Sequence, residues 1–100
     1  MPRRRSRSRR SKYEIYDDIL NVIYFQPDLP LTRIARAANL PVDRAKPLLQ
    51  FMLKRNLIFE DEVDGLTVYR TTPRGVEFIE LFKRIQKLLP SDEDLEGSNL

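Results

Sequence analysis

The sequence of 100 residues contains no cysteine, no histidine and no tryptophan, and it has only three glycines. Without cysteine there is no disulfide framework, and without cysteine or histidine there is neither a zinc finger nor a thiol or imidazole nucleophile. The glycines form no phosphate-binding loop, and the acidic clusters at 60–64 and 92–96 lack the spacing and turn glycine of a calcium site. We therefore expect no catalytic residue, no metal site, no cofactor and no enzymatic activity.

Long hydrophobic runs are lacking as well. No segment approaches the roughly 18 to 20 apolar residues that cross a bilayer. The apolar stretch behind the basic N-terminus is interrupted by Glu14, Asp17 and Asp18, which makes it a poor signal peptide. These features predict a cytoplasmic protein with no membrane partner.

The formal net charge of +3 conceals a segregation of charge along the chain. Residues 1–12 carry +7 and almost no aliphatic side chain, so they cannot bury enough apolar surface to offset the entropy of ordering. Residues 90–100 begin with a proline and carry −4, whereas residues 13–89 balance 11 basic against 11 acidic side chains. We predict a disordered arginine-rich arm over 1–12, one folded domain over 13–89, and a disordered acidic tail over 90–100.

The domain begins with a segment, Tyr13 to Phe25, whose apolar residues recur with helical spacing. These residues cover about half of the helix circumference, which is more than one neighbouring helix normally buries. We expect a helix that ends before Pro27 and packs against a second partner.

Residues 31–55 have the pattern of a helix-turn-helix. The first helix is expected over Thr32–Ala38 and the second over Val42–Arg55, with Asn39, Leu40 and Pro41 as the turn. Alanines in the first helix permit a close crossing of the two helices.

Pro47 lies inside the second of these helices, where it removes a backbone donor and presses on the preceding turn. A kink or a loosened first turn is therefore expected. Asn56 is expected to end the helix, because asparagine tolerates the left-handed conformation of a helix cap.

After Asn56 the hydrophobic period changes to two, which predicts a two-stranded wing over residues 57–71. The strands are expected at Leu57–Glu60 and Thr67–Thr71, and Asp64-Gly65 suits the tight hairpin turn between them. Thr72 then supplies a capping hydroxyl and Pro73 a first helical position, which opens a last helix over 73–89.

The predicted fold is mainly α with a small β-hairpin (α+β), in the order helix, helix, helix, strand, strand, helix. Two stretches add a family resemblance. LTRIARAANLPVDRAKPLLQFMLKRNLI resembles the helix-turn-helix half of archaeal winged-helix proteins, and YRTTPRGVEFIELF resembles their junction between wing and last helix. The chain resembles the archaeal winged helix-turn-helix family that includes the small ten-a-type chromatin proteins and related one-domain regulators. The junction is also similar to that of bacterial multiple-antibiotic-resistance regulators.

The resemblance implies a homodimer whose last helices pair, often as an antiparallel coiled coil, and whose partner is double-stranded DNA. It also implies a nucleoid-associated location and a role as a chromatin protein or a transcriptional regulator. Three departures qualify these expectations: Pro47 in the recognition helix, an acidic wing, and a last helix of only about 17 residues. They favour weak to moderate sequence specificity and a compact dimer.

The arm is the strongest candidate for contact with DNA, because its cations can neutralise phosphates and release counterions, and guanidinium groups suit a narrow minor groove. If all seven cations touched phosphate, the slope of log K against log [salt] would steepen by about 6. Arg44, Lys46 and Gln50 are the candidates for reading bases, although Asp43 beside them repels the backbone. The complete set of predicted nucleic-acid-binding residues is Arg3, Arg4, Arg5, Arg7, Arg9, Arg10, Lys12, Thr32, Arg33, Arg36, Arg44, Lys46, Gln50, Arg70 and Arg74. For Arg70 and Arg74 the alternative is pairing with nearby acids.

The apolar excess on the first and last helices favours a homodimer over a monomer that leaves some of these side chains exposed. In the last helix the apolar residues follow the spacing of a coiled-coil seam. The predicted dimer interface consists of Tyr16, Leu20, Tyr24, Phe78, Phe82, Ile85 and Leu89.

Two other functions remain open. A winged helix can serve as a protein–protein interaction module in transcription or RNA-processing machinery, and here the acidic wing would be the surface for a protein partner. The arm could instead bind RNA through its SRSRR stretch. If the partner is DNA, the acidic tail can compete with it for the arm and so temper binding.

Overall fold

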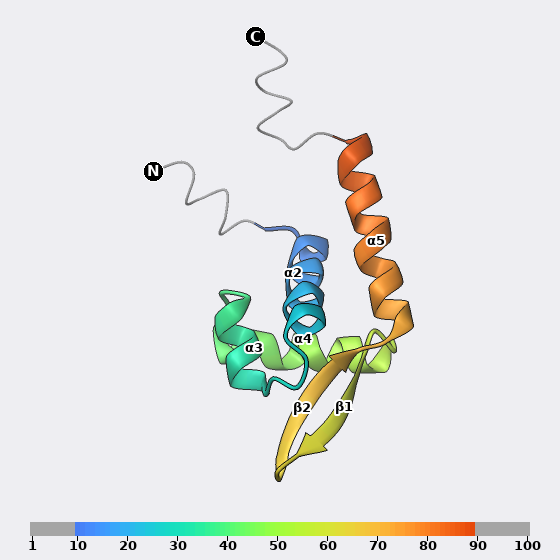
Figure 1. The fold of residues 1–100 in the computed structure, drawn as a ribbon. Helices are drawn as coiled ribbons and strands as arrows, with labels where there is room; N and C mark the ends of the chain where they lie inside the picture. The colour runs from blue at the N-terminus through green and yellow to red at the C-terminus, as the bar shows by residue number, and fades with distance from the viewer. Residues whose placement is uncertain (1–9, 90–100) are drawn as a thin grey trace.

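The computed structural model describes residues 10–89, and it contains the six elements in the predicted order (Figure 1). The fold is α+β, with four helices and one antiparallel hairpin. The elements are α2 (Lys12–Phe25), α3 (Leu31–Ala37), α4 (Val42–Lys54), β1 (Ile58–Val63), β2 (Leu66–Thr71) and α5 (Pro73–Leu88).

The first helix, α2, begins earlier than predicted because a capping box fixes its N-terminus. The Ser11 hydroxyl accepts from the backbone N–H of Glu14 at 3.1 Å, and the Ser11 N–H donates to the Glu14 carboxylate at 2.7 Å. The predicted domain boundary at residue 13 is therefore wrong by three residues, since Arg10 to Lys12 belong to the folded part.

Both helices of the helix-turn-helix end in the same way. Asn39 and Asn56 each have φ of +62°, and the next residue donates its N–H back across the helix end. These bonds run from Leu40 to Ala35 at 2.8 Å and from Leu57 to Met52 at 2.9 Å. The predicted cap at Asn56 is confirmed, and Asn39 provides a second one.

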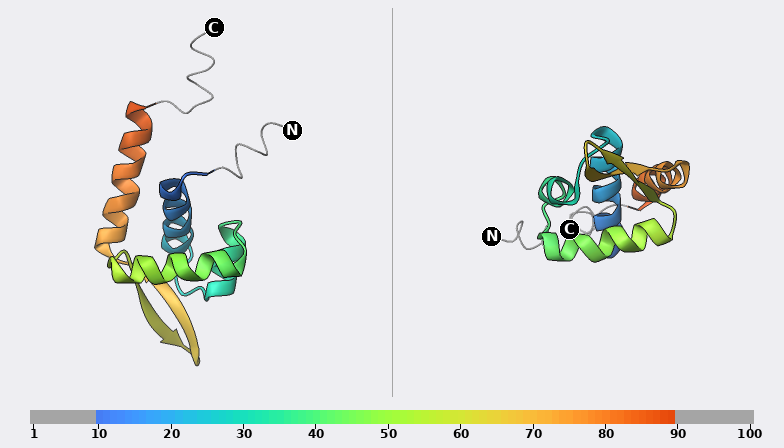
Figure 2. Two further views of the ribbon diagram at one scale, coloured as in Figure 1. Left: turned by 180° about the vertical axis from the view of Figure 1, so that it is seen from behind. Right: turned by 90° about the horizontal axis from the view of Figure 1, so that it is seen from below.

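The expected disturbance at Pro47 is absent. The helix α4 continues through Pro47, and its first turn is closed by the N–H groups of Arg44 and Ala45, which both donate to the Pro41 carbonyl at 3.0 Å (Figure 2). The prediction of a kink or a loosened turn is wrong, because Pro47 and Asp43 are both exposed. The proline ring can point to solvent, and water can satisfy the carbonyl that loses its donor.

The wing lies where it was predicted, but its two strands are longer than predicted. They pair from Ile58↔Thr71 to Val63↔Leu66, so Asp61 and Glu62, which were expected between the strands, lie in β1. Asp64 and Gly65 both have positive φ, +53° and +81°, as a two-residue type I′ turn requires. The predicted hairpin turn is thus confirmed.

The core is formed where α2 meets the other elements. α2 packs against α3, α5 and β2, so the second partner predicted for this helix lies within the same chain (Figure 2). The largest fully buried side chains come from α2, α3, α4 and β1: Ile19, Leu20, Ile23, Ile34, Leu49, Met52 and Ile58. At the start of α5, Gly75 passes so close to the Leu57 carbonyl that a Cβ would overlap it.

Candidate nucleic-acid interface

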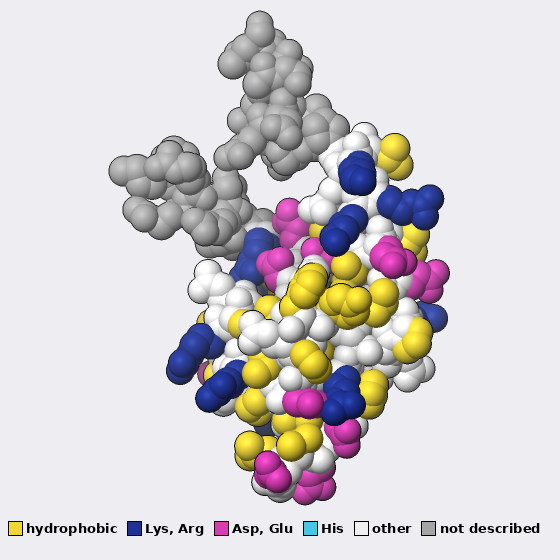
Figure 3. Space-filling view, viewed as in Figure 1, with side chains coloured by type: hydrophobic (Ala, Val, Ile, Leu, Met, Phe, Trp, Pro, Cys, Tyr) yellow, Lys and Arg dark blue, Asp and Glu magenta, His cyan; other side chains and the backbone are white. Residues whose placement is uncertain are grey.

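Four of the predicted cations are exposed on the helix-turn-helix, Arg33 and Arg36 on α3 and Arg44 and Lys46 on α4. Among the described residues, none of the four takes part in an ion pair. Figure 3 shows basic side chains along the α3 edge of one face of the molecule. These cations are free to meet phosphate groups.

The predicted polar residues of the two helices are also accessible. Thr32 is exposed in the first turn of α3, and Gln50 is exposed one helical turn after Lys46. Between them, however, α4 exposes Val42, Asp43 and Pro47, which offer few donors to base edges. The exposed surface of α4 therefore mixes charges of both signs with apolar side chains.

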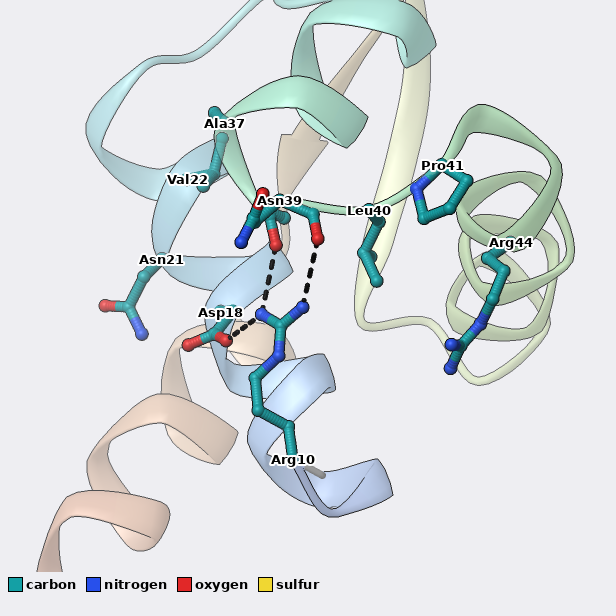
Figure 4. A pocket seen from close by; sticks show the side chains of 10 residues that line it. Arg10, Asp18, Asn21, Val22, Ala37, Asn39, Leu40, Pro41 and Arg44 are labelled. Carbon is teal, nitrogen blue, oxygen red and sulfur yellow. Dashed lines mark hydrogen bonds and ion pairs between the residues drawn. The ribbon is translucent and has the colours of Figure 1, made fainter. Parts of the chain in front are cut away.

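Arg10 does not lie free as a phosphate ligand would. Its guanidinium forms an ion pair with Asp18 at 2.6 Å and donates to the carbonyls of Ala38 at 3.0 Å and Asn39 at 3.2 Å (Figure 4). These contacts make one wall of an open cleft of about 810 Å³ that extends to Arg44 at the start of α4. The prediction that Arg10 contacts nucleic acid through this side chain conflicts with its three partners in the fold.

The remaining predicted cations fall into three groups. Lys12 and Arg74 are exposed in the first turns of α2 and α5. Arg70 instead pairs with Asp28 at 2.6 Å and approaches Asp61 at 4.0 Å, and the hydrogen bonds that it donates to the Asp28 carboxylate raise the pKa of Arg70 above its ordinary value. The alternative of pairing with nearby acids therefore holds for Arg70. The other predicted arm residues lie outside the described part of the chain: Arg3, Arg4, Arg5, Arg7 and Arg9.

The residues of the predicted dimer interface are partly buried in the core of one chain and partly exposed. Leu20 is fully buried and Tyr16 is 8% exposed, so both belong to the core of one chain. The prediction fails for these two because α5 and α4 of the same chain cover that side of α2. Tyr24, Ile85 and Leu89 are exposed and remain available to a partner.

An aromatic row links the core to the exposed side of α5. Tyr16 stacks on Phe51 of α4 at 5.5 Å between ring centroids and meets the edge of Phe78 at 6.4 Å. Phe78 in turn stacks on Phe82 at 5.9 Å. Phe51 is 42% exposed, and sequence reasoning missed it although it follows the apolar stripe of α4. Beyond this row α5 carries three further exposed apolar side chains, Leu81, Ile85 and Leu88.

The wing is acidic as predicted and is also partly apolar. Glu60, Asp61, Glu62 and Asp64 are exposed, and Figure 3 shows acidic side chains at the tip. Three large apolar side chains are exposed on the hairpin as well: Phe59, Val63 and Leu66. The wing is therefore poorly suited to press against phosphates.

Within residues 10–89, no group of three or more acidic side chains is placed to hold a metal ion. No helix of this part is both long and apolar enough to cross a membrane.

A winged helix-turn-helix family model matches residues 9–89. The chain belongs to the winged helix-turn-helix family. Its fold is similar to that of Sso10a-2, a DNA-binding protein from Sulfolobus solfataricus, with a TM-score of 0.68 and 24% identity over 91% of this chain and 97% of that one. The archaeal winged-helix resemblance is thus confirmed at the level of the fold.

Two further structures share this winged helix-turn-helix. MepR, a transcription regulator of the Staphylococcus aureus multidrug efflux pump MepA, gives a TM-score of 0.65 and 20% identity over 97% of this chain and 78% of that one. AF1382 from Archaeoglobus fulgidus gives a TM-score of 0.63 and 19% identity over 79% of this chain and 91% of that one. No curated protein matches the chain significantly.

Proposed function

We propose that this winged helix-turn-helix protein is a homodimer that binds double-stranded DNA, as a chromatin-type protein or a transcriptional regulator in the cytoplasm, without enzymatic activity. The observation that carries the proposal is a set of exposed cations on both helices of the helix-turn-helix that form no ion pair within residues 10–89, namely Arg33, Arg36, Arg44 and Lys46. Such cations neutralise phosphates and fix the register of a recognition helix on a duplex.

The sequence specificity is proposed to be weak to moderate. On α4 only Arg44, Lys46 and Gln50 carry groups that read base edges, and Asp43 beside them repels phosphate. The arginine-rich arm supplies phosphate or minor-groove contacts that do not depend on sequence. Affinity then comes mostly from backbone contacts and falls steeply with salt.

Two of the similar structures support a DNA partner. Sso10a-2 is described as a DNA-binding protein, and MepR has been solved bound to an oligodeoxyribonucleotide. Both share the helix-turn-helix and wing of this chain.

Dimerisation through α5 is part of the proposal. The exposed apolar residues of α5 need a partner, and the charges on this helix favour an antiparallel one. The first half carries Arg74, Glu77 and Glu80, a net charge of −1, whereas the second half carries Lys83, Arg84 and Lys87, a net charge of +3. Two antiparallel copies bring opposite charges together, and two parallel copies bring like charges together.

A titration of duplex DNA by fluorescence anisotropy tests the DNA partner. Lys46→Ala is expected to weaken binding several-fold, whereas Lys54→Ala, which removes the same charge from the far end of α4, changes it little. No binding of duplex DNA by the full chain at low micromolar concentration would contradict the proposal.

The exposed apolar and acidic wing favours one second candidate, a protein–protein interaction module. Phe59, Val63 and Leu66 offer apolar contact, and the acids beside them would select a basic partner. Failure to bind any nucleic acid favours this candidate, and a preference for single-stranded RNA over duplex DNA in the same titration favours RNA binding through the arm.

A further inference from the structure

We propose that Arg10 anchors the arginine-rich arm to the helix-turn-helix and is not itself a DNA contact. This inference rests on the proposed function, because the anchor sets where the arm leaves the domain relative to α4. Arg10 therefore has a different role from the other arginines of the arm, although it lies next to them in the sequence.

Arg10 joins two parts of the fold that are distant in sequence. Nη1 lies 2.6 Å from the Asp18 carboxylate in α2 and 3.0 Å from the Ala38 carbonyl, and Nη2 lies 3.2 Å from the Asn39 carbonyl. The side chain is only 21% exposed. Ser11, the next residue, is fixed as the N-cap of α2, so the backbone and the side chain of this segment are both held.

The two carbonyls explain why an arginine is needed here. Ala38 and Asn39 stand at the end of α3, where carbonyl groups have lost their helical donors. A guanidinium presents several donors in a fixed plane and can serve a carboxylate and two carbonyls together, which the single ammonium of a lysine cannot do in the same geometry. Arg10 therefore holds the turn that leads into α4.

The anchor has a consequence for DNA binding. The Arg10 side chain reaches the α3–α4 turn and lines the same cleft as Arg44 at the start of α4 (Figure 4). The arm and α4 are then presented to the same stretch of duplex. Releasing Arg10 raises the entropy lost when the arm binds, so affinity falls although no cation is removed.

Limited trypsin digestion tests the anchor without DNA. Trypsin must take the side chain before the cleaved bond into its specificity pocket. In the full wild-type chain the Arg10–Ser11 bond is expected to resist cleavage, and in Asp18→Ala it is expected to be cut at least several-fold faster. Glu62→Ala, which removes an exposed carboxylate from the wing, should leave that rate unchanged. Equal rates in wild type and Asp18→Ala, with equal melting temperatures, would overturn the anchor.

DNA affinity and its salt dependence test the consequence. Removal of a carboxylate normally strengthens DNA binding, because it removes repulsion from phosphate. The control variant Glu62→Ala is therefore expected to bind DNA at least as tightly as wild type. Asp18→Ala is instead expected to bind about 3- to 10-fold more weakly than wild type and to show a smaller salt slope, and Arg10→Lys should weaken binding although its charge is unchanged. Asp18→Ala binding as tightly as Glu62→Ala overturns the inference while the proposed function stands. Loss of DNA binding in every chain, wild type included, overturns the proposed function, while the protease result still decides the anchor.

Discussion

Asp17 is the residue whose environment conflicts most with its charge. It lies on α2, one of its carboxylate oxygens is buried without a hydrogen-bond partner among the described residues, and Asp18 is its neighbour. Burial raises the pKa of Asp17, and the negative charge of Asp18 raises it further, against the opposing effect of Lys83. The ionised form therefore destabilises the folded state at neutral pH.

This arrangement predicts that Asp17→Asn raises the melting temperature at pH 7. Because the folded pKa lies above the ordinary value, wild type gains stability as pH falls through the folded pKa, and the variant lacks that gain. The difference between the two melting curves should shrink toward pH 4 and should correspond to less than about 1 kcal/mol, since solvent screens the partly exposed group. A variant that melts below wild type at pH 7 contradicts this account.

Single residues also mark the limit of prediction from sequence. The caps at Asn56 and Thr72 and the Asp64-Gly65 turn were predictable because each depends on residues a few positions away. Arg10 was not, because its carbonyl partners are 28 and 29 residues distant in the chain. In a run of arginines, the sequence does not indicate which one is bound to the folded domain.

At the scale of elements, α4 stays helical although it contains a proline in its interior, where proline normally disrupts a helix. Pro47 lies on the exposed side of the helix, so its effect is the loss of one backbone hydrogen bond rather than a bend. We predict that Pro47→Ala stabilises the domain by about 1–3 kcal/mol, measured by thermal or urea unfolding. For Lys46→Ala, at the preceding position, the free energy of unfolding should stay within about 0.5 kcal/mol of the wild-type value. A Pro47→Ala chain no more stable than wild type would show that the helix has adapted fully to its proline.

The pairing of α5 makes a second prediction at this scale. Phe82→Glu places a charge in the apolar seam and should convert dimer to monomer in sedimentation. Glu77→Lys or Lys87→Glu alone should weaken the dimer by creating like-charge pairs, and the double variant should restore it if the helices run antiparallel. An unchanged mass for Phe82→Glu argues against this seam, and a double variant weaker than both singles argues against the orientation.

Periodicity predicted how wide the apolar surface of each helix is, but it did not identify the neighbour. For α2 the broad apolar arc is covered within the chain, by α3, α5 and β2. For α5 the same kind of arc is only half covered, and Ile85 and Leu88 stay exposed. The sequence alone does not separate these cases, because an apolar stripe is the same whether its partner is the same chain or another copy.

At the scale of the whole molecule, residues 13–89 have no net charge, so the place where their cations gather decides which face can meet DNA. The exposed cations of α3 and α4 gather around the helix-turn-helix, while acids occupy the wing. The structure also shifts the boundary between domain and arm, since Arg10 to Lys12 belong to the fold. The arm that we propose adds affinity for DNA is therefore residues 1–9, with five arginines.

The most direct test is the salt dependence of duplex binding by the full chain and by a chain that lacks residues 1–9. This deletion keeps the Arg10 anchor and the Ser11 cap, so the domain stays intact. The account predicts that the full chain binds duplex DNA at low micromolar concentration or tighter, and that the deletion lowers affinity and reduces the slope of log K against log [salt] by up to about 4.5 per protomer. Equal affinities and slopes for the two chains, or no duplex binding by either, would contradict it.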